Sequence, residues 1–307
     1  MTDLFAPQDE IAERIVTALQ IKLTAGEELR IHRKHTRSFE VWNLLTQGVE
    51  YFYRRTNIDN TRARQLFDQA IKADRSYSLA YALLAWTHRF EAQFGWGNRP
   101  DLSIERAAFL AEKARALDDE LPDVYALLGA IQIYGRRYDE AVASGEKAVA
   151  LNPNHATTTA LLAMFLHNAG KPKEALQKMK RAMRLSPYYS SWFLEELGFI
   201  YLDAEQPKEA LAVFKKYLER ESSGTHAAHA YIGRALSFHV LGHDDAARLE
   251  VTKAIEADSE ISVTRFGQHN LNQDVEQSKG GFASLGFAGE IMSAFGCDLN
   301  RSTQHIH

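Results

Sequence analysis

A repeat of 34 residues is the feature that most constrains the fold of this chain. The stretch from Pro122 to Pro187 matches itself when it is shifted by 34 positions. The matched pairs are Leu128 with Leu162, Gly129 with Ala163, Ala141 with Ala175, Ala148 with Ala182 and Pro153 with Pro187. A unit this short buries too little apolar surface to fold alone, so it must stack on its neighbours.

A helix, a short turn, a second helix and a proline-bearing turn every 34 residues resemble the tetratricopeptide repeat family. The resemblance implies an all-α fold: a right-handed superhelical solenoid of about six helix-turn-helix repeats. We expect an N-terminal helical lead-in over residues 1–37 and the repeat array over residues 38–260. C-terminal capping helices are expected over residues 261–296, followed by a mobile tail over residues 297–307.

A small residue in the first helix of each repeat lets the two helices approach closely. These positions are Gly48, Ala85, Gly129, Ala163, Gly198 and Ala235. We expect Tyr81, Tyr125 and Phe214 to fill the space between repeats. The turn of the first repeat is predicted around Asn57–Asn60. The second repeat carries an insertion, FGWGNRP, which favours a loop or a helix extension with a broken end.

Composition argues against several classes of function. The formal net charge of −4 disfavours a broad basic surface for nucleic acid or anionic lipid. The single cysteine, Cys297, excludes an internal disulfide and favours a reducing compartment. The chain shows no secretory signal pattern and no apolar run near the roughly 18 residues that span a membrane. We therefore expect a cytoplasmic protein without nucleic acid and without a membrane span.

Motifs that carry catalysis are absent from the sequence. There is no GxxxxGK[ST] or GxGxxG phosphate loop and no GxSxG nucleophile turn. The pairs His226/His229 and His239/His243 have helical spacing, but no carboxylate converges on them at a family spacing, which favours surface histidines. We predict a protein that is not an enzyme and that holds no cofactor or metal.

The family resemblance implies that the first helices of the repeats line a concave groove. The positions predicted to bind a protein or peptide partner there are Trp42, Phe52, Tyr53, Trp86, Arg89, Phe90, Tyr134, Met164, His167, Asn168, Trp192, Glu195, Glu196, Phe199, Asp203 and His239. Aromatic residues with arginine are typical of interaction hot spots. The alternative is that several of these aromatic residues pack between helices. For Phe94 and Trp96 of the insertion, packing on the neighbouring helix and partner binding both stay open.

The lysine, asparagine and arginine clamp by which one subgroup of the family holds acidic chaperone C-termini is not present here. Acidic residues instead occupy the later part of the predicted groove, at Glu195, Glu196 and Asp203. We therefore expect a helical or extended partner with apolar anchors and some basic character.

A narrower resemblance involves the opening segment TDLFAPQDEIAERIVTALQIKL. It is similar to the segment before the repeats in bacterial multidomain signalling proteins that carry a class III adenylate/guanylate cyclase domain or a winged-helix domain. The stretches AYALLAWTHRFEAQFGW and NPNHATTTALLAMFLHNAGKPKEAL are similar to that group as well. Three functions stay open: an interaction scaffold, the C-terminal regulatory part of a cyclase-type signalling protein, and a small-ligand sensor. A homo-oligomer also stays open.

Overall fold

The structure is a computed structural model that describes residues 38–259, and this part of the chain forms twelve helices and no strand. The helices are α2 (Phe39–Phe52), α3 (Asn57–Ala73), α4 (Ser78–Gln93), α5 (Pro100–Leu117), α6 (Pro122–Tyr134), α7 (Tyr138–Leu151), α8 (Ala156–Asn168), α9 (Pro172–Leu185), α10 (Trp192–Asp203), α11 (Pro207–Leu218), α12 (Gly224–Val240) and α13 (Asp244–Ala257). The predicted lead-in, capping helices, tail and Cys297 lie outside the described residues.

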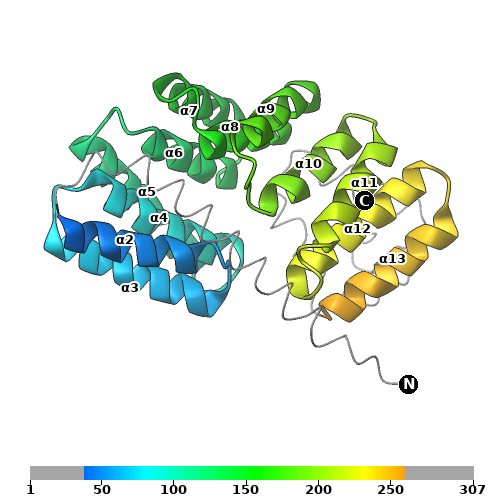
Figure 1. Cartoon of the computed structure of the whole chain (residues 1–307), viewed down its shortest axis with the longest axis horizontal. Helices are drawn as coiled ribbons and strands as arrows, with labels where there is room; N and C mark the ends of the chain where they lie inside the picture. The colour runs from blue at the N-terminus through cyan, green and yellow to red at the C-terminus, as the bar shows by residue number, and fades with distance from the viewer. Residues whose placement is uncertain (1–37, 260–307) are drawn as a thin grey trace, which may run out of the picture. The chain divides into compact units, whose positions relative to one another are not determined.

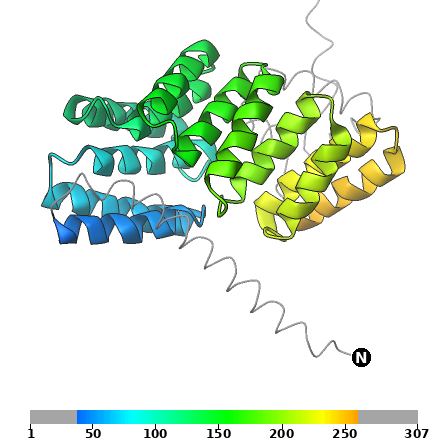
Figure 2. The same cartoon turned by 45° about the horizontal axis from the view of Figure 1, so that its top comes forward.

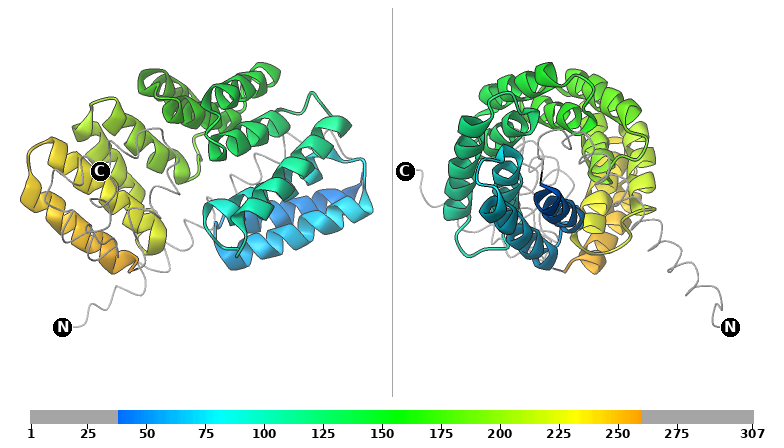
Figure 3. Two further views of the ribbon diagram at one scale, coloured as in Figure 1. Left: turned by 180° about the vertical axis from the view of Figure 1, so that it is seen from behind. Right: turned by 60° about the vertical axis from the view of Figure 1, so that its left-hand side comes forward.

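Consecutive helices pack against each other in pairs (Figure 1): α2 with α3, α4 with α5, α6 with α7, α10 with α11, and α12 with α13. The α12–α13 pair, drawn yellow to orange, lies side by side again in Figure 2, and Figure 3 shows the blue α2–α3 pair in the same relation from behind. The all-α helical-repeat fold is confirmed. The right-handed superhelical course stays a prediction.

The described residues divide into two compact units. The first unit contains residues 38–166 and 177–190, and the second contains residues 167–176 and 191–259. Helices α2 to α7 belong wholly to the first unit, and helices α10 to α13 belong wholly to the second. The division passes through α8 and α9.

Proline sets the start of several helices. Pro100, Pro122, Pro172 and Pro207 are the first residues of α5, α6, α9 and α11. Proline suits this position because its fixed φ is helical and the amide proton it lacks would have no partner within the helix. The proline-bearing turns of the sequence repeat, at Pro153 and Pro187, lie in the connections before α8 and α10.

The first connection differs from the prediction. Asn57–Asn60, expected as the turn, form the first turn of α3, and the chain turns at residues 53–56. The side-chain oxygen of Thr56 accepts a hydrogen bond from the backbone nitrogen of Asp59 at 3.1 Å. This N-cap satisfies a free amide of the helix end and starts α3 earlier than the repeat pattern indicated.

The small residues predicted in the first helices are buried, and a phenylalanine ring explains the size limit. A Cβ on Gly48 would lie 2.4 Å from the ring of Phe67, and a Cβ on Gly129 would lie 2.3 Å from the ring of Phe165. Both phenylalanines are fully buried. Side chains in such a packed interior have no room to move aside, so these sites require glycine.

Phe214 of α11 fills the space between helices as predicted. Its ring stands 2.5 Å from the Cβ position of Gly198 on α10 and 2.2 Å from that of Gly233 on α12. Tyr81 and Tyr125, predicted for the same role, are only partly buried. Tyr81 packs against the buried core of the first unit, and the role of both tyrosines between repeats stays a prediction.

Candidate functional site

Aromatic and arginine side chains of the first two repeats gather around the C-terminal end of α4. They come from the end of α2, the turn after it, the last two turns of α4 and the insertion loop at residues 94–99. We call this set the aromatic–arginine cluster: Phe52, Arg55, Trp86, Arg89, Phe90, Phe94 and Trp96. All of it lies within the first unit.

The rings of the cluster form a continuous chain of contacts. Phe52 stacks on Phe90 with 4.7 Å between ring centroids, and Trp86 meets Phe90 edge-on at 6.0 Å. Phe94 meets Phe90 edge-on at 5.5 Å and stacks on Trp96 at 4.8 Å. The insertion therefore packs back on α4, as one of the two alternatives held. All five rings nevertheless stay partly exposed.

Two guanidinium groups lie against the same rings. The guanidinium carbon of Arg55 lies 5.5 Å from the ring centroid of Phe90 and 5.4 Å from that of Phe94. The guanidinium carbon of Arg89 lies 5.8 Å from Trp86 and 5.9 Å from Phe90. The negative faces of aromatic rings attract such cations.

Arg89 is buried, with only 3% of its surface exposed. Its guanidinium donates a hydrogen bond to the side-chain oxygen of Gln93, and its buried Nε atom has no hydrogen-bond partner among the residues that the structure describes. Burial, followed by the like charge of Arg55, lowers the pKa of Arg89 to about 9, while Tyr134 acts weakly in the opposite direction. No carboxylate of residues 38–259 is among the causes of this shift. Keeping this side chain charged therefore costs free energy.

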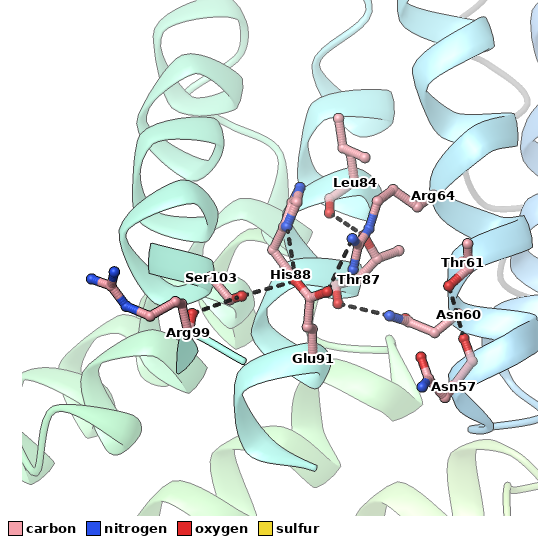
Figure 4. A network of polar contacts seen from close by, with 10 residues as sticks. All are labelled: Asn57, Asn60, Thr61, Arg64, Leu84, Thr87, His88, Glu91, Arg99 and Ser103. Atoms are coloured by element: carbon pink, nitrogen blue, oxygen red, sulfur yellow. Dashed lines mark hydrogen bonds and ion pairs between the residues drawn. The ribbon is translucent and has the colours of Figure 1, made fainter. Parts of the chain in front are cut away.

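Glu91, the carboxylate nearest to Arg89 in sequence, is engaged elsewhere (Figure 4). One of its oxygens accepts a hydrogen bond from Arg64 of α3 at 3.2 Å, and the other accepts one from the Ser103 hydroxyl of α5 at 2.8 Å. The second oxygen also lies 3.5 Å from Nδ1 of His88. Burial alone would raise the pKa of Glu91, but these donors hold it below its usual value.

The same polar network fixes the C-terminal half of α4 (Figure 4). The side-chain amide of Asn60 donates to the Thr87 carbonyl at 3.0 Å. Burial, and then the charge of Arg64, lowers the pKa of His88 to about 4 against the opposing effect of Glu91, so His88 is neutral near pH 7. Helices α3, α4 and α5 are thus tied together beside the rings, which positions the cluster.

In the second unit the predicted acidic residues are bonded to buried histidines. Nδ1 of His167 lies 2.7 Å from a carboxylate oxygen of Glu196, and Nε2 lies 2.7 Å from one of Asp203. Burial would lower the pKa of His167, but the charges and hydrogen bonds of the two carboxylates raise it to about 10. Nδ1 of His229 lies 3.0 Å from Glu195. The three predicted acidic residues thus have histidine neighbours, while the side chain of Asp203 stays half exposed, and the basic character of a partner stays a prediction.

The remaining predicted site residues do not all join the cluster. Tyr53 borders it, with 6.0 Å between its ring and that of Phe52. Trp42 packs on Phe39 at 6.1 Å, and Trp192 packs on Phe193 at 4.4 Å.

Phe199 is 8% exposed and meets Phe214 edge-on at 5.0 Å, so it belongs to the core. Asn168 is buried and Met164 is partly buried. Nδ1 of His239 lies 2.9 Å from Asp244 at the start of α13.

Sequence reasoning missed Arg55. It lies in the turn after α2 with φ 53°, the left-handed region that non-glycine residues rarely adopt. The groove was predicted on the first helices of the repeats, and Arg55 lies outside these helices. The turn that contains Arg55 was predicted at Asn57–Asn60, later in the chain. The signal that could have found Arg55 is a cation directly after the aromatic end of the first helix.

Residues 38–259 contain no group of three or more histidine, cysteine, aspartate or glutamate side chains placed to hold a metal ion. In the same part of the chain, no helix combines the length and the apolar character that a membrane crossing requires.

A family model of known proteins matches two stretches of the chain that form helix pairs in the structure. Residues 126–190 and 196–260 match the family model described as tetratricopeptide repeat. "Putative adenylate cyclase 3" of Rhizobium meliloti (strain 1021) is 29% identical over 141 residues, which cover 46% of this chain and 24% of that protein. "Anaphase-promoting complex subunit 7" of Homo sapiens is 29% identical over 97 residues, covering 32% of this chain and 17% of that protein. The matched region thus spans less than a quarter of either relative.

Solved structures share the fold at low identity. The APC/C hetero-tetramer Cut9–Hcn1 matches with a TM-score of 0.59 and 14% identity, over 82% of this chain and 45% of that chain. PilW, described as a widely conserved type IV pilus biogenesis factor, matches with a TM-score of 0.53 and 18% identity, over 79% of this chain and 99% of that chain. These similarities concern the fold alone.

Proposed function

Because the chain is a tetratricopeptide repeat protein, we propose that it is a protein-interaction module whose partner segment binds at the aromatic–arginine cluster. The observation that carries the proposal is the gathering of partly exposed rings and two arginines on α2, α4 and the insertion loop. Tryptophan, tyrosine and arginine are the side chains most enriched among residues that dominate binding energy. The polar network around Glu91 supports the proposal because it holds these side chains in place before a partner arrives.

The role is one of binding, and the described residues are proposed to carry no catalysis. The similarity to "Putative adenylate cyclase 3" favours one setting for it: the repeat portion of a signalling protein, which recruits a partner or regulates an output domain. A cytoplasmic location, favoured by the single cysteine, belongs to the same proposal. An in-frame cyclase domain upstream in the gene would support this setting, and its absence would leave the stand-alone scaffold.

The experiment is a selection of random 12-residue peptides displayed on phage against the full chain. Enriched peptides are then synthesised with a fluorophore, and their affinity is measured by fluorescence anisotropy. We expect Trp86→Ala and Phe94→Ala to weaken binding about tenfold or more, the loss typical of a hot-spot aromatic residue.

Phe109→Ala is the matched control, since Phe109 is an aromatic residue of the same unit that is 62% exposed on α5 and outside the cluster. Its affinity should be unchanged. Enrichment of no peptide, or equal binding by Trp86→Ala with an unaltered circular dichroism spectrum, would overturn the proposal.

A further inference from the structure

The insertion loop at residues 94–99 packs directly on Glu91 of α4. The backbone nitrogen of Trp96 donates a hydrogen bond to the Glu91 carbonyl oxygen at 3.0 Å. A Cβ on Gly97 would lie 3.1 Å from Cγ and 3.2 Å from Cδ of Glu91, so the loop backbone lies against this side chain. Glycine permits so close an approach because it has no side chain that would displace the carboxylate.

The carboxylate of Glu91 also reaches the far end of the loop. One of its oxygens accepts a hydrogen bond at 2.8 Å from Ser103, in the first turn of α5 (Figure 4). The Ser103 hydroxyl oxygen lies 3.3 Å from the carbonyl oxygen of Arg99, the last residue of the loop. The other Glu91 oxygen accepts a hydrogen bond from Arg64 of α3 at 3.2 Å. One side chain, itself held by α3 and α5, therefore contacts both the middle and the end of the insertion.

The same loop carries two rings of the aromatic–arginine cluster. Phe94 and Trp96 stack on each other at 4.8 Å, and both are partly exposed. The contacts of Glu91 with Trp96 and Gly97 fix the backbone that carries these rings. A loop fixed in one conformation has its binding side chains arranged before a partner arrives, which reduces the entropy that binding costs.

We infer that Glu91 is a positioning residue for partner binding: it holds the insertion loop in the conformation that presents Phe94 and Trp96. This inference rests on the proposed function, and the role does not require Glu91 to touch the partner. Without Glu91 the loop would adopt several conformations, and fewer free molecules would be ready to bind. The observed affinity falls in proportion to that fraction.

Limited proteolysis of the full chain with chymotrypsin measures the order of the loop, because this protease cleaves after aromatic residues such as Phe94 and Trp96. We expect Glu91→Ala to raise the rate of cleavage after these two residues about tenfold or more, since cleavage depends on local opening. The products are identified by mass spectrometry. An unchanged rate of loop cleavage in Glu91→Ala would overturn the inference.

Glu112→Ala is the matched control. Glu112 is an exposed glutamate of α5 that pairs with Arg115 at 2.6 Å, outside the insertion loop. Its replacement should leave the cleavage rate after Phe94 and Trp96 unchanged.

The binding rates of the fluorescent selected peptides, measured by stopped flow, separate positioning from contact. Glu91→Ala should slow association about tenfold and leave dissociation within about twofold, because fewer free molecules are ready to bind while the bound complex keeps its rings. Trp96→Ala should instead speed dissociation, because it removes a contact. A general loss of stability in a chain that remains folded would change neither rate.

Glu91→Gln keeps the length of the side chain and one acceptor oxygen, so it should restore part of the association rate. Should Glu91→Ala lose helical content, Ser103→Ala tests the same contact and should slow association about threefold or more. Faster loop cleavage with an unchanged association rate would overturn the inference and leave the proposed function intact. Failure of every peptide to bind would remove the proposed function, and with it the role of Glu91 in binding, even where the proteolysis result holds.

Discussion

At the scale of a single residue, the buried charge of Arg89 is expected to lower the stability of the folded chain. A guanidinium buried against Trp86 and Phe90, with no carboxylate partner among residues 38–259, is expected to destabilise the folded chain. We predict that Arg89→Met, which keeps the length and loses the charge, raises the free energy of unfolding by about 1 kcal/mol or more in urea titrations. Arg115→Met, at an exposed arginine of α5, should change it by less than about 0.5 kcal/mol. A loss of stability in Arg89→Met would show that the charge is structural.

Backbone conformation at the turns gives a second prediction at this scale. Gly95, Gly170 and Gly242 adopt positive φ just after the first helix of a pair, and Arg136 and Glu205 adopt it at the matching places. A residue with a side chain loses about 1–2 kcal/mol of stability in this conformation, and glycine avoids that loss. Glycine also loses more conformational entropy on folding, which cancels part of the advantage. Glu205→Gly should therefore stabilise the chain by about 0.5–1 kcal/mol, measured in urea, and Gly242→Ala should destabilise it. Opposite signs would contradict the strain argument.

At the scale of helices, the distance between neighbours is set by glycine against phenylalanine. A Cβ on Gly129 of α6 would lie 2.3 Å from Phe165 of α8, with Phe165 itself fully buried. We predict that Gly129→Ala lowers the free energy of unfolding by about 1–3 kcal/mol, because the helices must move apart. Gly135→Ala, where the nearest atom is 3.4 Å away at the end of a flexible arginine, should change it by under about 0.5 kcal/mol. Similar losses in both variants would refute the close-approach explanation.

Helix boundaries and close helix contacts were predictable from the sequence where residues nearby in the chain determine them. The small residues at Gly48 and Gly129 follow from the close approach of the helices and were predicted from the repeat. The turns that carry Pro153 and Pro187 also lie between helices, as the period indicated. The turn at Asn57–Asn60 was misplaced because the Thr56 cap, a single hydrogen bond, outweighed the spacing of the repeat. Periodicity reveals which face of a helix is apolar and cannot reveal which ring fills a given space, so the contacts of Phe67 with Gly48 and of Phe165 with Gly129 were not predicted.

For the whole molecule, two histidines should shape the dependence of stability on pH. The folded pKa of His167 lies at about 10, above the unfolded value near 6.5, so its contribution is complete below pH 6.5 and is lost as pH rises toward 10. The folded pKa of His88 is depressed to about 4, so its contribution is complete above pH 6.5 and is lost as pH falls toward 4. Between its unfolded and folded pKa values, each histidine changes the free energy of unfolding by up to about 1.4 kcal/mol per pH unit.

The expected result is a stability maximum near pH 6.5 in thermal unfolding followed by circular dichroism. His167→Gln should flatten the alkaline side of the curve, and His88→Gln should flatten the acidic side, each leaving the other side unchanged. Flattening of the same side by both variants would contradict the assignment.

The candidate site was predictable only in part. Trp86, Phe90, Phe94 and Trp96 were identified from helix position and from the insertion, and the structure brings them into contact. That Arg89 has no carboxylate partner within the described part of the chain was not predictable, because it depends on where Glu91 and its partners on α3 and α5 lie in space. The acidic residues of the second unit were visible in the sequence, but their histidine partners lie 29 to 36 residues away.

The ring of Phe214 bears on how such an array can be recombined or redesigned. It sits on α11 yet sets the size limit of Gly198 on α10 and of Gly233 on α12, in the following repeat. A repeat exchanged alone, cut at its own turns, would separate this ring from one of its glycines. Chimaeras joined in the α11–α12 connection should therefore require glycine at position 233 of the incoming helix. The unit that must be transferred intact is the Phe214 ring with Gly198 and Gly233. This unit extends into the next repeat and so does not coincide with the helix pair that the sequence period suggests.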